Sequence, residues 1–249
     1  MTGGRIVVGC AGWSLPRAVQ DAFGAGDSHL ARYATRFAAT EINASFHRPH
    51  RRSLYEKWAA AVPPDFGFCA KLPKTITHEQ RLIATEPLLD TFLDEAGGLG
   101  GQLRCLLVQL PPKLAFDGTI AADFLRQLRD RFAGAIACEP RHASWFTPEA
   151  DALLADWQVA RVLADPVRHA PGCLPGGWPR LVYVRLHGSP RMYYSAYDGD
   201  VLRALATRIL QAAADGADVW CMFDNTASGA ATGDALALTA LLQEESRSR

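Results

Sequence analysis

Short apolar segments recur along the whole chain, and most of them end on or next to a charged or amide side chain. We expect strands over Ile6–Cys10, Thr40–Phe46, Phe66–Lys71, Cys105–Leu110, Ile136–Glu139, Arg161–Asp165, Leu181–His187 and Val219–Asp224. Segments of this length and composition are typical of buried strands. Polar groups at the ends of many parallel strands are what a (β/α)8 barrel uses to build a functional site. The pattern therefore predicts an α/β fold of the TIM-barrel type, with its site at the carboxyl ends of the strands, an end that we call the mouth.

Amphipathic segments lie between the predicted strands. We expect helices over His29–Ala38, Ser53–Val62, Glu86–Glu95, Ala121–Phe132, Pro148–Trp157, Val201–Ala214 and Gly233–Leu242. Strands that alternate with helices indicate a parallel sheet with right-handed crossovers. A doubly wound open sheet is the alternative, but no glycine-rich phosphate-binding fingerprint follows the first strand.

The segment between Asp165 and Leu181 breaks this alternation. It reads PVRHAPGCLPGGWPR and is too rich in proline and glycine for a helix. We therefore predict an irregular loop over Pro166–Arg180 in place of the sixth helix. No linker or repeat divides the chain, so residues 1–249 are expected to form a single barrel domain with a fraying polar tail at 244–249.

Composition limits the classes of partner. The 249 residues suit one barrel, and 26 basic side chains balance 26 acidic ones, so no overall field favours nucleic acid or a membrane. Six cysteines fall mostly within strand-like segments and without a CxxC pair, which indicates buried, reduced side chains. The first residues lack the apolar stretch of a signal peptide, and no segment reaches membrane-spanning length. A cytoplasmic location is expected.

Side-chain parity indicates which polar groups share the interior. Residues i and i+2 of a strand lie on one face. In the predicted strand Thr40–Phe46 this alternation places Glu41 and Asn43 on one face, and in Arg161–Asp165 it places Arg161 and Asp165 on one face. We expect the polar ends of most strands to converge on one cavity at the mouth, and the central members are Glu41, Lys71, Glu139, Asp165, Arg185, His187 and Asp224.

Carboxylates and imidazoles at this end suit acid–base catalysis or ligation of a divalent metal. The catalytic candidates are Glu41, Glu139, His142, Asp165, His187 and Asp224. His142 is the preferred general base, because its position in the loop beyond the fifth strand permits contact with a substrate. Against a metal, no HxH or HExxH spacing occurs, and Lys71, Arg141 and Arg185 fall at the same mouth. The cofactor therefore stays unassigned, with a divalent metal as one possibility.

Cations, amides and aromatic rings at the same end suit binding of a small anionic ligand. The substrate-binding candidates are Asn43, Lys71, Gln109, Arg141, Trp145, Arg185, Tyr194 and Asn225. Guanidinium groups match phosphate or carboxylate, and loop aromatics can stack on a sugar or base. The turn that begins at Asn225 precedes a helix, whose start can bind an anion. In the alternative, Arg185 pairs with Glu139 and Lys71 with Glu41 as structural ions, the aromatics form the loops' own core, and the turn is a plain helix cap.

Ordered motifs run from the first strand to the last helix. They are GCAGWS at 9–14, EINASFHRPHR at 41–51, WAAAVPPDFGFCAKLPKTITH at 58–78, QLPP at 109–112, EPRHASW at 139–145, ADP at 164–166, YVRLHG at 183–188 and FDNTASGAA at 223–231. In these motifs the chain resembles the YecE-like family, catalogued as domain of unknown function 72. The resemblance implies a TIM-type barrel and supplies no reaction. The chain departs from the family's usual Tyr at His47, and from its usual Asn at Asp234, which we interpret as variation near a helix start.

Two classes of function remain. The first is an enzyme, nearest to a hydrolase or lyase, that acts on a phosphorylated or sugar-containing anion at the mouth. The second is a non-catalytic module that binds a ligand or single-stranded nucleic acid through Arg48, Arg51, Arg52 and the loop aromatics. The neutral net charge favours the first. If Arg185 clamps the anion, its guanidinium should be reachable from the mouth and keep hydrogen-bonding capacity.

Overall fold

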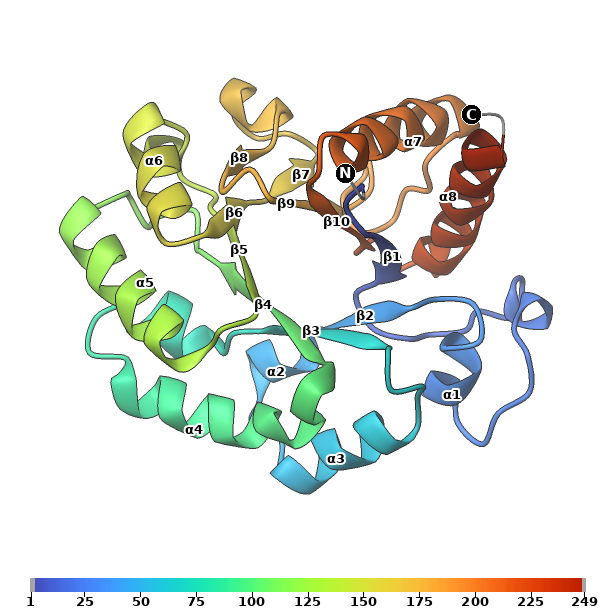
Figure 1. Ribbon diagram of the computed structural model, residues 1–249, viewed down its shortest axis with the longest axis horizontal. Coiled ribbons are helices and arrows are strands. Elements are labelled where there is room, and N and C mark those ends of the chain that lie inside the picture. Colours follow the sequence, from blue (N-terminus) through green and yellow to red (C-terminus); the bar gives the residue numbers. More distant parts are fainter. Residues whose placement is uncertain (1–2, 248–249) are drawn as a thin grey trace.

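The strands lie side by side around a ring, with the helices outside it (Figure 1). This computed structural model describes residues 3–247. The strands are β1 (Ile6–Cys10), β2 (Ala39–Ile42), β3 (Gly67–Lys71), β4 (Leu103–Gln109), β5 (Ala135–Glu139), β6 (Val159–Arg161), β7 (Leu163–Asp165), β8 (Gly176–Gly177), β9 (Leu181–Leu186) and β10 (Asp218–Phe223). Each predicted strand therefore has a counterpart, with the sixth divided into β6 and β7.

Hydrogen bonding groups the strands into two sheets. One has the order β1-β10-β9-β7, and the other has the order β2-β3-β4-β5-β6-β8. All pairs are parallel except β6 with the two-residue β8. The sheets meet at a parallel bridge between Ala11 and Glu41, and at Val162, whose N–H donates to Cys138 O over 2.8 Å. The predicted α/β class with parallel strands is confirmed, whereas the ladder is divided between two sheets.

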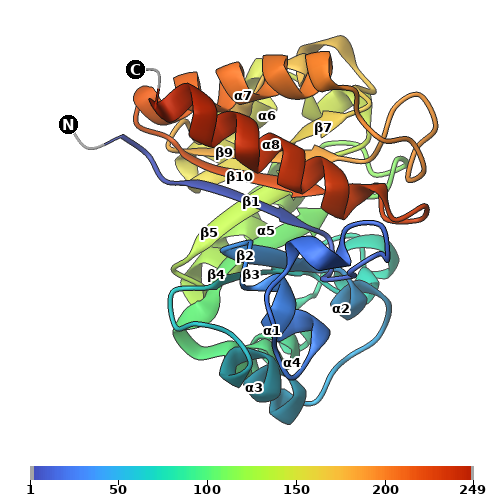
Figure 2. The same ribbon diagram turned by 90° about the vertical axis from the view of Figure 1, so that its right-hand side faces the viewer.

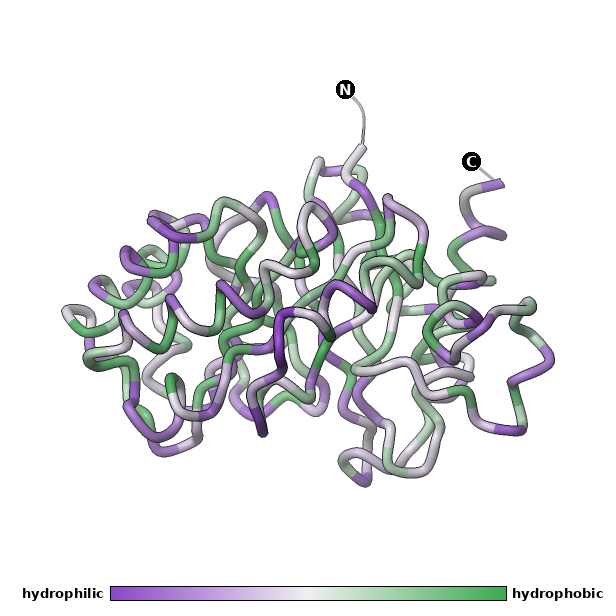
Figure 3. Tube along the Cα trace, turned by 90° about the horizontal axis from the view of Figure 1, so that it is seen from below, coloured by the Kyte–Doolittle hydropathy of each residue, from purple (hydrophilic) through white to green (hydrophobic). Residues whose placement is uncertain are grey.

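Helices cover the outside of both sheets. They are α1 (His29–Tyr33), α2 (Ala44–His47), α3 (Arg52–Ala60), α4 (Glu86–Ala96), α5 (Gly118–Arg131), α6 (Pro148–Asp156), α7 (Gly199–Ala214) and α8 (Ala230–Arg247). Four of them begin at side-chain caps, in which Ser28, Asp117, Thr147 and Asp198 accept bonds from backbone N–H groups of the first turn. The colours along the helices alternate between hydrophilic and hydrophobic (Figure 3), as amphipathic helices require.

The two last helices pack together across β1 and β10 (Figure 2). The final helix is longer than the sequence indicated, because α8 starts at Ala230 and continues to Arg247. Residues 244–247 of the polar tail predicted to fray continue this helix, and its last two residues lie outside the described part of the chain. Asp234 is the fifth residue of this helix, one turn beyond its start.

Apolar side chains fill two spaces, one between the strands and the helices and one inside the ring of strands. The inner cluster comprises Val7, Ala39, Cys69, Cys105, Leu107, Ala137, Ala160, Val162, Leu181, Tyr183, Trp220 and Met222. All six cysteines are free, and all but the exposed Cys173 are buried, as expected for most of them. Burial of each large apolar side chain contributes about 1.5–3 kcal/mol, so these layers fix the strands that carry the mouth.

The second strand is shorter than predicted. It ends at Ile42, and Asn43 has the helical backbone angles φ −85° and ψ −21° that begin α2. The hydroxyl of Ser45 lies 3.0 Å from the carbonyl of Ile42 and 2.6 Å from that of Lys71, which holds this turn against β3. The predicted strand parity of Asn43 is therefore wrong, because local hydrogen bonds favour a helical turn there.

The sixth strand has the opposite parity to the prediction. Ala160 and Val162 belong to the inner cluster and Ala164 packs against it, so Arg161 and Asp165 lie on the outer face. Arg161 Nε donates to Asp151 Oδ1 of α6 over 2.7 Å. The small side chains Ala160, Val162 and Ala164 occupy the inward positions of this strand, so the charged Arg161 and Asp165 take the outward positions.

The segment Pro166–Arg180 contains no α-helix, which confirms the predicted irregular loop. It forms one 3-10 turn at Ala170–Cys173 and the two-residue strand β8. Side chains cap its backbone: Asp151 Oδ1 accepts from Gly177 N over 3.1 Å, and Arg208 Nη2 donates to Cys173 O over 2.8 Å. These bonds replace the ladder that a helix would have supplied.

Candidate functional site

A fully buried guanidinium lies at the centre of the mouth. Arg185 of β9 donates from Nε and Nη2 to the two oxygens of Glu41 over 3.0 and 2.6 Å. Its Nη1 donates to Glu139 Oε2 over 2.5 Å, and its Nη2 also donates to Asp224 Oδ2 over 3.0 Å. Glu41 lies in β2 and Glu139 ends β5 of one sheet, whereas Arg185 lies in β9 and Asp224 directly follows β10 of the other. Arg185 therefore joins the two sheets through ion pairs.

Arg185 and its three carboxylates form a buried network, and their opposite charges offset the cost of burial. Burial opposes the charged form of Arg185, but Glu41, Glu139 and Asp224 raise its pKa well above the ordinary value. Burial likewise favours the neutral form of Glu139, but the charges of Arg185, His187 and Arg141 together outweigh it and hold the pKa of Glu139 well below its usual range. Removing one member would leave the others buried without a counter-charge.

His187 lies between two of these carboxylates. Its Nδ1 is 3.0 Å from Asp224 Oδ2, and its Nε2 is 3.1 Å from Glu139 Oε1. Only the doubly protonated imidazolium can donate to both oxygens. Burial lowers the pKa of His187, but the charge of Glu139 and the two hydrogen bonds outweigh it, so the pKa is raised above 6.5. The ring of Tyr193 covers the imidazole edge-on at 5.7 Å.

Three further side chains complete the network. The hydroxyl of Tyr183 donates to Glu41 Oε2 over 2.9 Å, and Asn43 Nδ2 donates to Asp224 Oδ1 over 3.3 Å. Arg141 donates to Glu139 Oε1 from Nε and Nη2 over 3.3 and 3.2 Å. Asn43 thus reaches the predicted site, although through a helical turn and not through the predicted strand.

Lys71 differs from the other cations of the mouth. It ends β3 and is 6% exposed, and no carboxylate in residues 3–247 lies within 4.0 Å of its ammonium. The ammonium lies over the ring of Phe46, 4.1 Å from its centroid. Burial and then the charge of Arg185 lower the pKa of Lys71 to about 8, against the attraction of the nearby carboxylates.

Positive charge therefore exceeds negative charge at the mouth. With Lys71 and His187 protonated, three carboxylates face four cations, which gives a net charge of +1. The carboxylates are Glu41, Glu139 and Asp224, and the cations are Lys71, Arg141, Arg185 and His187. Burial lowers the pKa of His78, and the charges of Lys71 and Arg141 lower it further.

Two predicted catalytic residues lie outside the network. Asp165 accepts from the hydroxyl of Tyr197 over 2.7 Å on the outer face, so its predicted place in the mouth is wrong. His142 caps the 3-10 turn Ala143–Trp145, where its Nδ1 lies 2.9 Å from the hydroxyl of Ser144. It flanks the mouth and is half-buried, but its contacts are those of a turn cap.

The predicted binding residues Gln109, Trp145 and Asn225 are all buried, but they differ in their contacts. Gln109 is buried at the end of β4, in register with Glu139. Trp145 is buried, and its Nε1 donates to Leu114 O over 3.0 Å, so its ring belongs to the core. Asn225 is fully buried, and its amide donates to Asp234 Oδ2 over 2.7 Å, which anchors the last loop.

The clamp predicted for Arg185 does not fit its surroundings. The guanidinium is fully buried and forms ion pairs with three carboxylates, as the alternative of a structural partner requires.

The exposed Tyr194 is another predicted binding residue, and the guanidinium of Arg191 lies over its ring, 4.0 Å from the centroid. The reasoning from sequence missed Phe46 as the platform of Lys71, and no strand pattern indicates it, because Phe46 lies in the unforeseen α2.

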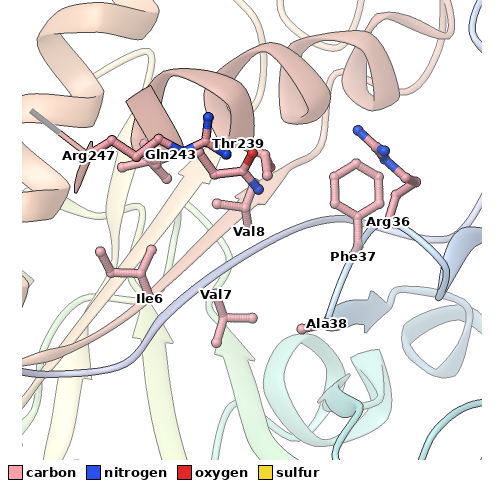
Figure 4. A pocket seen from close by; sticks show the side chains of 10 residues that line it. Ile6, Val7, Val8, Arg36, Phe37, Ala38, Thr239, Gln243 and Arg247 are labelled. Atoms are coloured by element: carbon pink, nitrogen blue, oxygen red, sulfur yellow. The ribbon is translucent and has the colours of Figure 1, made fainter. Parts of the chain in front are cut away.

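Cavities lie at both ends of the strands. One of about 480 Å³, between the start of β1 and the end of α8, is lined by Ile6, Val8, Phe37 and Arg36 among others (Figure 4). It is at the amino ends, away from the network. A second, of about 240 Å³, lies at the carboxyl ends. Its lining includes Phe46, the residue that supports Lys71.

Neither a metal cluster nor a membrane helix is found in the described part of the chain. Within residues 3–247, no group of three or more His, Cys, Asp and Glu side chains is arranged to hold a metal ion. At the mouth the carboxylates face Arg185 and His187 instead. No helix among these residues is long and apolar enough to cross a bilayer.

Fold and site together define an α/β protein with parallel strands that carries a buried carboxylate–guanidinium–imidazole network at the carboxyl ends of those strands. The chain belongs to the family described as "Protein of unknown function DUF72", whose model matches residues 7–249. The resemblance to YecE-like proteins is thereby confirmed.

Individual relatives agree with this assignment. The chain is 29% identical to the UPF0759 protein YecE of Escherichia coli K12 over 106 residues, which are 43% of this chain and 38% of that protein. The match thus spans well under half the length of this curated relative.

Two solved structures of DUF72 family proteins share the fold. One is from Enterococcus faecalis, with a TM-score of 0.78 and 21% identity over 98% of this chain and 99% of that one. The other is from Thermotoga maritima, with a TM-score of 0.76 and 22% identity over 96% of this chain and 99% of that one.

Proposed function

We propose that this protein is an enzyme that binds a small anionic ligand, phosphorylated or sugar-containing, and acts on it by proton transfer at the mouth. In this proposal the two sheets work as one barrel of the (β/α)8 type, and the reaction is a hydrolase or lyase reaction. The observation that carries the proposal is the ammonium of Lys71, which has no carboxylate partner although three carboxylates lie in its neighbourhood.

The cations of the rim support binding of an anion. Arg141 keeps part of its side chain exposed, at 17%, while it pairs with Glu139. Together with Lys71 it offers charge-assisted donors, which are about twice as strong as neutral ones. The 240 Å³ cavity at the same ends of the strands shares Phe46 with this site, although neither Lys71 nor Arg141 lines it.

We assign the proton-transfer step to Lys71 and not to His187. Both ring nitrogens of His187 already face carboxylate oxygens, and the ring is 3% exposed. A group that transfers protons works best when its pKa lies near the working pH, and the pKa of Lys71 is about 8. The network of Glu139, His187 and Asp224 positions the strand ends and sets the field that Lys71 experiences.

Inorganic phosphate and glycerol 3-phosphate test the binding step. At about 100 times its dissociation constant, a ligand that binds only the folded state raises the free energy of unfolding by about 2.7 kcal/mol. We expect that rise in the natural protein and in Lys57→Met, which changes an exposed lysine on α3. It should be lost in Lys71→Met. An equal rise in both variants contradicts the proposal, as does its absence from the natural protein.

The alternative of a nucleic-acid module has weaker support. Arg52 pairs with Glu56 and Asp94 at 3.3 and 3.1 Å, so the expected basic patch includes acids that compensate it. Arg48 and Arg51 remain exposed. Binding of single-stranded DNA that weakens steeply with salt and is unchanged in Lys71→Met would favour this alternative over the enzyme.

A further inference from the structure

Lysine is scarce in this chain, and one lysine is buried. Of 26 basic side chains, four are lysines, at positions 57, 71, 74 and 113. Lys57, Lys74 and Lys113 are exposed, whereas Lys71 lies at the mouth and is 6% exposed. Arginine binds phosphate or carboxylate through more hydrogen bonds, and it keeps its proton. Lysine is the cationic side chain that can release its proton and become a nucleophile.

The surroundings of Lys71 leave its amine uncommitted. The three carboxylates of the network are bound to Arg185 or His187, and Nζ lies over the face of Phe46. The guanidinium of Arg185 acts on it as a neighbouring positive charge. Desolvation and a second cation next to an amine are the two conditions that activate a lysine for attack on a carbonyl carbon.

We propose that Lys71 condenses with the carbonyl group of a small anionic carbonyl compound, a 2-oxo acid or a phosphorylated ketone, while Arg141 binds the anion. This inference rests on the proposed function and names its substrate class. It extends the proposed role of Lys71 from proton transfer to formation of a covalent bond with the substrate.

The step balances without a redox partner. The lone pair of the neutral Nζ forms a bond to the carbonyl carbon, and the C=O π pair moves to oxygen, which takes up the proton that the nitrogen releases. The carbinolamine then loses its hydroxyl group together with the remaining N–H hydrogen as one water, while the nitrogen lone pair completes the C=N bond of the imine. Protonation of the imine restores a positive charge at this position, which the nearby Glu41 and Glu139 stabilise as they do the ammonium.

The titration of Lys71 agrees with this role. With the pKa near 8 and not 10.5, the fraction of neutral amine at neutral pH is on the order of several hundred times that of an ordinary lysine. His78, whose pKa burial, Lys71 and Arg141 lower, is neutral and does not add another charge. The other groups that act on Lys71 are Arg185, Glu41, Glu139 and Asp224.

Trapping with borohydride tests the inference on the whole protein. The probes are pyruvate and dihydroxyacetone phosphate, with acetone as the neutral control. Hydride reduction of the imine fixes the probe as a secondary amine, with a mass gain equal to the ketone less one oxygen atom. We expect peptide mapping to place this gain on Lys71 for both anionic probes, with at least tenfold less on Lys57, Lys74 and Lys113 and little label from acetone.

The variant Lys71→Arg keeps the charge and cannot form the imine. We expect it to lose the label while inorganic phosphate still raises its free energy of unfolding. If that variant does not fold, the distribution of label among the four lysines of the natural protein decides. Label spread according to exposure, or no label at all, overturns the inference. If phosphate still stabilises the unlabelled protein, the proposed function stands without the imine; if it does not, both fail.

Discussion

Two buried arginines lie on opposite faces of the strands and do different work. Arg161 faces outward, forms a salt bridge with Asp151, and lies over the ring of Phe146 at 4.9 Å. Arg185 faces inward and joins three carboxylates from both sheets. Both are structural by their contacts. What distinguishes the inner region is the extra cation beside its network, so the proposed site rests on the unpaired charge of Lys71 and not on the density of charge.

The largest effect should come from the inner arginine. We expect Arg185→Met to lower the free energy of unfolding by about 3–5 kcal/mol, because it leaves three carboxylates buried without their counter-charge. Chemical denaturation measures the change. Adding Glu139→Gln should recover part of the loss. If Arg185→Met unfolds as the natural protein does, Arg185 is not the scaffold that joins the sheets.

The outer arginine should matter less. We expect Arg161→Met to lower the free energy of unfolding by about 2–3 kcal/mol, because it removes charge-assisted bonds to a single carboxylate that is one-third exposed. The same denaturation series measures it. Binding of phosphate should be unchanged, and a loss of binding here would contradict the separation of the two regions.

The contribution of His187 can be measured from the pH dependence of the free energy of unfolding. Its pKa is raised in the folded state, so its contribution is fully present below its unfolded pKa near 6.5 and is lost as the pH rises through the raised value. The difference in stability between the natural protein and His187→Gln should therefore shrink from pH ~6 to pH ~9. Denaturation at several pH values checks this. A difference that grows with pH would show that the imidazole is neutral between its carboxylates.

The smallest change in stability should follow the loss of Lys71. Its pKa is lowered by burial and by Arg185, so the folded state disfavours its charge. We expect Lys71→Met to raise the free energy of unfolding at neutral pH by roughly 1 kcal/mol. Denaturation at pH ~7 and above pH ~10 checks the sign, since the gain should fade once the amine is neutral in both states. A marked loss of stability would mean that Lys71 belongs to the scaffold.

Much of the inner network follows from strand parity. Glu139, Arg185 and His187 end long apolar runs, and their alternation with buried residues places them inward. Parity failed at Asp165, because the small side chains Ala160, Val162 and Ala164 set the register and the strand changes sheets at Val162.

Other features depend on contacts that no local pattern contains. The position of Asn43 follows from a turn held by Ser45. The state of Lys71 depends on which carboxylates Arg185 has already engaged, and these come from strands far apart in the chain. Residue type and spacing therefore identify the members of the network but not which of them keeps an uncompensated charge.

The most direct test of that uncompensated charge is the effect of inorganic phosphate on the free energy of unfolding of the natural protein and of Lys71→Met. If the unpaired ammonium marks the site, phosphate stabilises the natural protein and leaves the variant unchanged. Stabilisation of equal size in both, or in neither, would contradict the claim that the charge of Lys71 distinguishes the mouth from the rest of the molecule.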